Sequence, residues 1–246
     1  RSHCDWSSDV CSSDLISAHA KIYENSTVSS YELSNSHVKV NTKSGSVKAE
    51  RVVLACNGYL GNLEKRLNSK ILPMNNYIVA TIPLDNETVA KINPRDIAFA
   101  DSRFVINYFR LSADKRLLFG GGENYSQELS NNIIPIVTKP LEQIYPFLKG
   151  VKIDYAWGGK LAITMNRLPF YKEMNKGKVL SAQGYSGQGV ALASYAGKVI
   201  AEKITGDGQT FDTMANIPMQ SFPGGRFLRN PTMKIGMFYH ALLDRL

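Results

Sequence analysis

Apolar and polar residues alternate in short runs through residues 21–56. Alternation with a period of two is typical of half-buried β-strands, and clusters of polar residues between the runs are typical of turns. The clearest turn signal is Lys-Ser-Gly at residues 43–45. The pattern predicts a β-meander that leads into a buried apolar strand, with strands at residues 21–23, 28–33, 37–41, 46–49 and 52–56.

The middle of the chain mixes strand and helix patterns. β-branched and aromatic runs predict strands at residues 75–84, 104–111, 116–120 and 151–164, with the turn Ser-Ala-Asp-Lys joining the second and third. Residues 62–71 predict a short helix. Apolar positions at helical spacing behind a proline predict a longer helix at about residues 136–148.

The clearest unit of the sequence lies in its last third. A short apolar strand at residues 179–183 is followed by the turn GYSGQGV at residues 184–190 and then by a helix from about residue 189. Gly206 comes directly after the last periodic position, where a glycine commonly caps a helix. The apolar face of this predicted helix consists of Val190, Ala193, Ala196, Val199, Ile200 and Ile204.

Three functional interpretations of the glycine turn can be compared. A phosphate loop requires a lysine after its last glycine, but Gly189 is followed by Val190. A G-x-G-x-x-G dinucleotide turn requires a different spacing and an acidic residue on the next strand. In the third interpretation, free N–H groups of the helix N-terminus face an electron-rich group, such as the N1–C2=O edge of a reduced flavin. An ordinary strand-to-helix turn fits the spacing as well.

Residues 1–15, RSHCDWSSDVCSSDL, have no apolar period, and residues 5–15 read codon for codon like a sequencing-library adapter. We interpret this segment as adapter-derived and exclude it from the fold. It holds one arginine and three aspartates, so the remaining chain carries a net charge of +10 instead of +8. It also holds Cys4 and Cys11, which leaves Cys56 as the one remaining cysteine. The natural start is then expected to lie further upstream.

Composition narrows the class of protein. One cysteine forms neither an internal disulfide nor a zinc cluster, so we expect a reduced cytoplasmic protein without a structural metal. No apolar run approaches the length of a membrane span, and we expect a soluble protein without a membrane partner. Basic residues are spread along the chain without a nucleic-acid motif, so the positive charge favours an anionic cofactor or substrate over nucleic acid.

Several longer stretches resemble the D-amino-acid-oxidase-like FAD-dependent oxidoreductases, and within them the gamma-glutamylputrescine oxidases. They are RVVLACNGYLGNL, FADSRFVINYFRLSADKRLLFGGG, YAWGGKLAITMNRLPF, GYSGQGVALASYAGKVIAEKITG and the tail with IPMQSFPGGR and LRNP. The resemblance implies an α/β (α+β) fold, with an FAD-binding domain of the D-amino-acid-oxidase type and an inserted antiparallel β-sheet substrate domain. The implied parts are an FAD-binding domain at residues 16–72 and 158–210, a substrate domain at 73–157, and a tail at 211–246 that ends in a short helix.

Carried onto matching positions, the resemblance also implies a set of site residues. Val28 would lie near the FAD adenosine. The other cofactor-binding positions would be Ala55, Cys56, Asn57, Gly58, Gly158, Gly159, Arg167, Gly184, Tyr185, Ser186, Gly187, Gln188, Gly189 and Val190. Tyr108, Arg110 and Trp157 would face the substrate. Tyr108 and Trp157 also suit core packing, and Arg110 also suits a surface ion pair.

Two departures from the family pattern bear on function. The amino-terminal βαβ unit of the family, with its G-x-G-x-x-G turn, is absent from the sequence. Gly-Gly-Gly-Glu-Asn at residues 120–124 is only superficially similar to that turn, because it lies in a β-rich region with no helix after it. The chain as given is therefore expected to bind FAD weakly or not at all. Relatives that oxidise free amino acids hold the substrate carboxylate with an arginine where this chain has Leu161. A substrate amine without an α-carboxylate next to the reacting carbon is therefore expected.

The implied reaction is oxidation of an amine C–N bond by hydride transfer to the flavin. The imine is then hydrolysed, and molecular oxygen reoxidises the flavin to give hydrogen peroxide. No cysteine lies near residues 158–164, so FAD is expected to be noncovalent. No dedicated general base is visible, and the catalytic residue is unknown. The competing hypotheses are oxidation of another amine or an amino acid, and a truncated binding domain without catalysis.

Overall fold

The structure is a computed structural model that describes residues 14–103, 106–124, 128–225, 228–229, 231 and 235. The predicted adapter-derived segment at residues 1–15 lies outside the described residues except for its last two, and so does the predicted terminal helix at 237–246. The chain divides into two compact units, Arg1–Val52 and Val53–Leu246.

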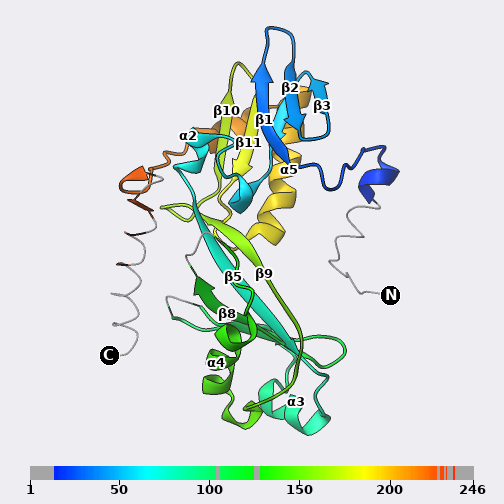
Figure 1. The fold of residues 1–246 in the computed structure, drawn as a ribbon, viewed down its shortest axis with the longest axis vertical. Helices are drawn as coiled ribbons and strands as arrows, with labels where there is room; N and C mark the ends of the chain where they lie inside the picture. Colours follow the sequence, from blue (N-terminus) through cyan, green and yellow to red (C-terminus); the bar gives the residue numbers. More distant parts are fainter. Residues whose placement is uncertain are drawn as a thin grey trace. The chain divides into compact units, whose positions relative to one another are not determined.

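The first unit contains an antiparallel sheet of three strands in the order β1-β2-β3 (Figure 1). The Thr42 hydroxyl closes the predicted hairpin, because it donates to the Gly45 carbonyl at 3.0 Å and accepts from the Gly45 amide at 3.1 Å. The predicted meander is confirmed, except that residues 21–23 are not a strand. The strands are β1 (Val28–Leu33), β2 (Val38–Thr42) and β3 (Ser46–Ala49).

The second unit contains a five-stranded antiparallel sheet in the order β6-β7-β8-β5-β9. Figure 1 shows its two long strands, β5 and β9, running side by side. The predicted antiparallel sheet is therefore confirmed. Its strands are β5 (Leu72–Thr81), β6 (Phe99–Ala100), β7 (Tyr108–Leu111), β8 (Leu117–Asn124) and β9 (Ile153–Ile163).

One face of this sheet is covered by α4 (Ile134–Ile144). Successive side chains of a strand point to opposite faces, so alternate residues of β5 and β8 meet this helix. Tyr77, Phe119 and Leu141 are fully buried in the resulting core, which α3 (Asn86–Ile92) and the 3₁₀-helix η2 (Pro146–Leu148) extend. The Phe109 and Phe119 rings stack with centroids 5.4 Å apart.

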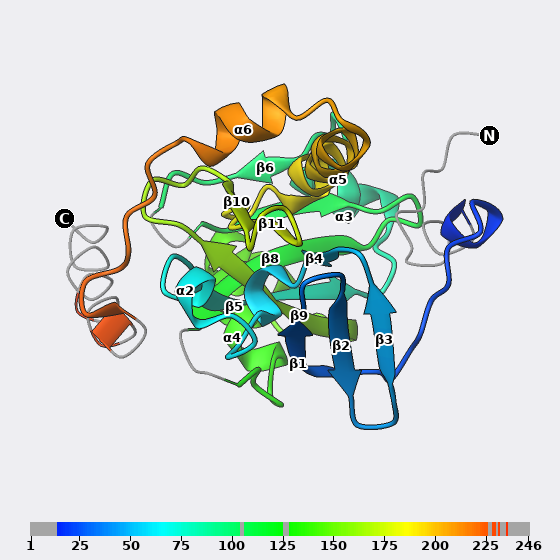
Figure 2. The same cartoon turned by 90° about the horizontal axis from the view of Figure 1, so that it is seen from above.

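A second sheet has the order β10-β11-β4 and packs against α5 and α6. Viewed from above, α5 and α6 lie on the same side of this sheet (Figure 2). Ala196 and Val199 of α5 are buried, and the ring of Phe211 in α6 meets Tyr171 edge-on at 5.7 Å. The elements are β4 (Val52–Leu54), β10 (Phe170–Met174), β11 (Val179–Gln183), α5 (Gly189–Thr205) and α6 (Gln209–Ala215).

The strand, glycine turn and helix predicted in the last third are confirmed, and Gly206 ends α5 in the left-handed conformation with φ +111°. Several predicted elements are shorter than expected. The helix predicted at 62–71 is α2 (Lys65–Asn68), and the strand predicted at 104–111 is β7 within the described residues. The strand predicted at 52–56 ends at residue 54, because the chain turns into η1 (Asn57–Tyr59). The helix predicted at 136–148 runs from 134 to 144 and then breaks, since Tyr145 precedes Pro146 and leaves the helical conformation.

Candidate functional site

The turn between β11 and α5 is held in place from both sides. The Gly184 amide donates to Oδ1 of Asn57 at 3.0 Å, and the Ser186 amide donates to the Ala162 carbonyl at 3.0 Å. Gly184 has φ +77°, and a Cβ at this position would lie 2.4 Å from Cγ2 of Thr164. Glycine is therefore required at residue 184 both by the backbone conformation and by the close approach of β9.

The start of α5 exposes backbone donors. The Gln188 amide donates back to the Tyr185 carbonyl at 2.9 Å, but within the described residues the amides of Gly187, Gly189 and Val190 have no hydrogen-bond acceptor. No side chain caps this helix end. Free N–H groups together with the positive end of the helix dipole favour negative charge at this position. The amides of Gly184 and Ser186 already donate within the protein, so neither is open to a ligand.

The side chain of Tyr185 points away from the open end of the turn and into the α5 core. Tyr185 is 8% exposed, and its hydroxyl donates to the Ala182 carbonyl at 3.0 Å. Burial, with a smaller contribution from the nearby Tyr171, raises the pKa of Tyr185 to about 12. The phenol therefore stays protonated at neutral pH and acts as a packing group.

Four of the predicted cofactor residues line one cavity of about 480 Å³, which we call the α5 cavity: Ala55, Asn57, Tyr185 and Gly189. Small residues of α5, such as Ala193 and Gly197, form its floor. Next to it, burial raises the pKa of the Cys56 thiol, so this thiol is not a nucleophilic thiolate at neutral pH. Small residues beside open amides suit the close approach of a flat ring with an electron-rich edge, so these residues fit a flavin.

The segment of η1 lies against β9. The Lys160 amide donates to the Tyr59 hydroxyl at 3.1 Å, and a Cβ on Gly58 would lie 2.5 Å from the Lys160 carbonyl oxygen. Gly158 and Gly159 of β9 lie in the same stretch, where a Cβ on Gly158 would lie 2.6 Å from the Tyr77 ring. These glycines thus permit tight packing between segments that are about a hundred residues apart in sequence.

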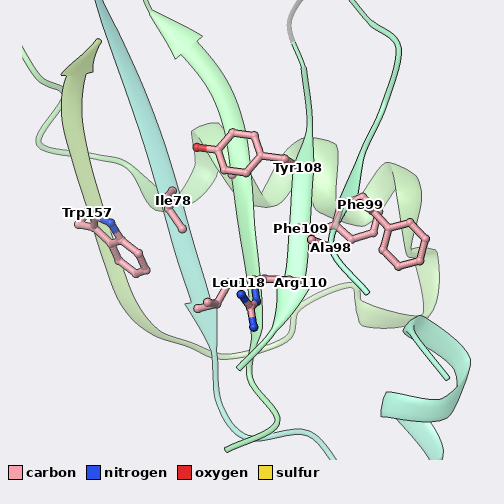
Figure 3. Close-up of a pocket in the computed structure, with 9 residues that line it drawn as sticks. Ile78, Ala98, Phe99, Tyr108, Phe109, Arg110, Leu118 and Trp157 are labelled. Atoms are coloured by element: carbon pink, nitrogen blue, oxygen red, sulfur yellow. The ribbon is translucent and has the colours of Figure 1, made fainter. Parts of the chain in front are cut away.

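A second cavity, of about 220 Å³, lies on the face of the five-stranded sheet opposite α4; we call it the sheet cavity (Figure 3). Pairing places Trp157 opposite Ile78, Ile78 opposite Gly120, and Gly120 opposite Tyr108, so one row crosses four strands. The next row pairs Arg110 with Leu118. The lining residues are Ile78, Ala98, Phe99, Tyr108, Phe109, Arg110, Leu118, Gly120 and Trp157.

Tyr108 lies flat across β8 because residue 120 is glycine. A Cβ on Gly120 would lie 2.2 Å from the Tyr108 ring, and the Tyr108 hydroxyl donates to Oδ1 of Asn76 on β5. In Figure 3 this hydroxyl points from β7 toward Ile78 and Trp157. Trp157 is 44% exposed, which leaves one side of the indole open to a ligand.

The structure brings the predicted site residues together in two groups. Tyr108, Arg110 and Trp157 share the sheet cavity, although Arg110 is paired with no carboxylate among the described residues. Arg167 is an exposed turn residue with φ +61° that follows β9. Val28 lies on β1 in the first unit. The assignment of all these residues to cofactor or substrate remains a prediction.

Sequence reasoning missed several residues that shape the site. The sequence does not predict that the Asn57 side chain accepts from the Gly184 amide, and the assignment of Asn57 to the cofactor stays a prediction. Asn76, Gly120 and Thr164 were not singled out, and their roles depend on pairings between distant strands that no local pattern reveals. Gln183, at the end of β11, is fully buried, and neither polar atom of its amide has a hydrogen-bond partner among the described residues.

The described residues show neither a metal cluster nor a membrane helix. No group of three or more His, Cys, Asp or Glu side chains within this part of the chain lies close enough to hold a metal ion. In the same residues, no helix combines the length and apolar character needed to cross a lipid bilayer.

Comparison with solved structures identifies the fold. Glycine oxidase from Geobacillus kaustophilus matches with a TM-score of 0.62 at 20% sequence identity, over 77% of this chain and 50% of that chain. L-proline dehydrogenase from P. horikoshii matches with a TM-score of 0.62 at 22% identity, over 82% and 54% of the two chains. The predicted mixed α/β fold of the D-amino-acid-oxidase type is confirmed.

The family model of the FAD dependent oxidoreductases (DAO) matches residues 12–203. The chain belongs to this family, whose cofactor is FAD, as the motifs predicted. The probable oxidoreductase OrdL of Rhizobium meliloti (strain 1021) is 40% identical over 93% of this chain and 53% of its own length. Gamma-glutamylputrescine oxidoreductase of Escherichia coli (strain K12) is 37% identical over 92% and 53%. The chain thus spans about half the length of these relatives.

Proposed function

We propose that the full-length protein containing this chain is an FAD-dependent amine oxidase that acts on gamma-glutamylputrescine. An amine R–CH₂–NH₂, molecular oxygen and water would give an aldehyde, ammonia and hydrogen peroxide. The observation that carries the proposal is the sheet cavity, in which Tyr108, Arg110 and Trp157 gather on a chain of this oxidoreductase family. The similarity to gamma-glutamylputrescine oxidoreductase supports the choice of substrate.

The turn before α5 would hold the electron-rich edge of FAD. When bound, FAD supplies the acceptor for the two electrons removed from the C–N bond. The amides of Gly187, Gly189 and Val190 would stabilise negative charge at that edge, because they have no acceptor among the described residues. Noncovalent attachment is expected, since the thiol of Cys56 stays protonated and is the free cysteine within the described part of the chain.

The walls of the sheet cavity would orient the amine. Apolar side chains such as Ile78 and Leu118 exclude water from the bound substrate, and the Trp157 ring offers a flat wall. Leu161 packs partly buried against the cluster that contains Leu72 and Met74. No cation therefore stands at residue 161 to hold an α-carboxylate, which favours a simple amine carbon over the α-carbon of an amino acid.

The test uses the full-length protein, purified without added flavin. We expect a yellow protein that releases FAD on acid precipitation and produces hydrogen peroxide with gamma-glutamylputrescine. Glycine and L-proline serve as matched substrates that carry an α-carboxylate at the reacting carbon, and we expect lower kcat/KM for both. A colourless protein, or one that prefers the amino acids, contradicts the proposal. Repeating the assay without oxygen but with an artificial acceptor tests whether oxygen takes the electrons.

A further inference from the structure

Arg110 is the one charged residue among the described residues that line the sheet cavity. The other lining residues are apolar apart from the Tyr108 hydroxyl, which donates to Asn76. Arg110 itself is exposed, so water solvates its guanidinium when no ligand is bound. The cavity therefore offers one open cation to a negatively charged group, beside apolar walls that suit the rest of a ligand.

The guanidinium of Arg110 has most of its donors open. Its Nε donates to the Leu111 carbonyl at 3.2 Å, and no carboxylate in the described part of the chain forms an ion pair with it. Figure 3 shows the side chain reaching from β7 over Leu118 toward the middle of the sheet. The two terminal nitrogens thus lie on the cavity side, in the fork geometry that binds a carboxylate through two hydrogen bonds.

Arg116, directly before β8, provides the contrast. Its side chain donates to Asp114 at 2.7 Å and to Asp154 at 2.6 Å, and its guanidinium lies 5.1 Å from the centre of the Tyr155 ring. The protein therefore pairs the more buried arginine, whose side chain is 16% exposed, with its own carboxylates. The exposed Arg110 has no carboxylate partner among the described residues, so its donors face solvent and are open to a ligand.

The width of the sheet gives an upper bound on the length of that ligand, because the Arg110 side chain reaches from β7 back over Leu118. Trp157 and Tyr108 lie in one row on strands β9 and β7, three strand spacings apart. Neighbouring strands lie about 4.8 Å apart, so the row spans about 14 Å. An extended chain covers about 3.8 Å for every three bonds. The ten bonds between the primary amine and the carboxylate carbon of gamma-glutamylputrescine therefore span about 13 Å on the same basis.

We propose that Arg110 determines specificity by binding a carboxylate at the end of the substrate remote from the reacting amine. The inference rests on the proposed function, because it places the reacting amine at the Trp157 side of the cavity, next to Gly158 and Gly159. A substrate with a carboxylate about ten bonds from the amine would place the amine near Trp157 and the carboxylate at Arg110. Putrescine alone has no carboxylate and would leave Arg110 unpaired.

The experiment compares gamma-glutamylputrescine with its analogue in which the carboxylate is converted to a carboxamide. The variants are Arg110→Gln and Arg110→Lys in the full-length protein, with Lys149→Gln as a control for net charge, since Lys149 is exposed and outside the cavity. We expect Arg110→Gln to lower kcat/KM for the acid by roughly 10- to 100-fold, the effect of one charge-assisted pair. Activity with the carboxamide should stay within about threefold. Arg110→Lys should recover part of the loss.

Two outcomes overturn the proposal: an equal loss with both substrates, which would mean a structural role, and no loss with the acid. If the wild-type protein oxidises neither substrate, the proposed function fails. The role of Arg110 is then tested separately, by measuring how tightly a carboxylate ligand binds. Calorimetry with the monobutylamide of glutaric acid, which has the carboxylate but no amine, should then show roughly tenfold tighter binding to the wild type than to Arg110→Gln. Equal binding overturns the role of Arg110 as well.

Discussion

Replacing Gly184 with alanine tests how tightly the turn before α5 is built. The added methyl group meets two obstacles. The backbone at residue 184 has φ +77°, and the ideal Cβ position lies 2.4 Å from Cγ2 of Thr164. Thr164 is 1% exposed and its hydroxyl donates to the Leu168 carbonyl at 2.8 Å, so its side chain has little room to move.

The two obstacles give separate contributions to the free energy of unfolding. A left-handed conformation costs alanine about 1–2 kcal/mol relative to glycine. Forcing an extra methyl group into a packed site costs about 1–3 kcal/mol. We therefore expect Gly184→Ala to lower the free energy of unfolding by about 2–5 kcal/mol. Gly187→Ala is the matched control, because Gly187 has φ +96° but no atom within 4 Å of its Cβ position.

Urea denaturation of the full-length protein, freed of FAD so that Gly187 has open space around it, measures these differences. Gly184→Ala should be less stable than Gly187→Ala by about 1–3 kcal/mol, the packing contribution. Combining Gly184→Ala with Thr164→Ser removes the clashing methyl group and keeps the hydroxyl, so the double variant should recover that difference. If the two alanine variants are equally stable, or Thr164→Ser recovers nothing, the contact with β9 does not determine the residue at 184.

Two further predictions concern buried polar groups. Tyr185 has a pKa of about 12 in the folded protein against about 10 when unfolded, so its contribution to stability is complete below about pH 10 and is lost as the pH rises toward 12. In urea titrations from pH 8 to 12, Tyr185→Phe should therefore lose less stability than the wild type. The same pH dependence of the free energy of unfolding in both proteins would contradict this prediction. Arg229 is 7% exposed and donates to the carbonyls of Asn68 and Ile71. Arg229→Met should lower the free energy of unfolding by about 2–3 kcal/mol and speed proteolytic removal of the C-terminal segment, whereas wild-type protease resistance would refute this role.

Elements with a strong local signal were predicted well. The strand, glycine turn and helix of residues 179–206 follow from an apolar run, three glycines and a helical period, and all three features are local. The helix α3 was missed although Asp85 caps it, with Oδ1 accepting from the Thr88 amide at 2.8 Å. Its seven residues bury one apolar side chain, Ile92, so the sequence of this short helix shows no clear apolar periodicity.

The contacts of the site were harder to predict than its elements. Asn57 and Gly184 are 127 residues apart, and the hydrogen bond between them depends on how η1 and β11 pack. Nothing in either local sequence encodes that distance, so the sequence does not predict this contact, and the assignment of Asn57 to the cofactor stays a prediction. The predicted domain division at 72/73 and 157/158 falls at β5 and within β9, which pair along their length. The division of the chain into two domains at these positions stays a prediction.

Register decides which side chains reach the sheet cavity. Successive side chains of β7 point to opposite faces of the sheet, and α4 covers one of these faces. Leu111 is therefore buried in the core under α4, whereas Arg110 lies on the open face. A slip of β7 by one residue would turn Arg110 and Tyr108 into that core and expose Phe109. The pairing of Phe109 with Phe119, whose rings stack, fixes the register from the buried side. The apolar core therefore places Arg110 on the open face, and the proposed specificity depends on the same strand alignment as the packing of the core.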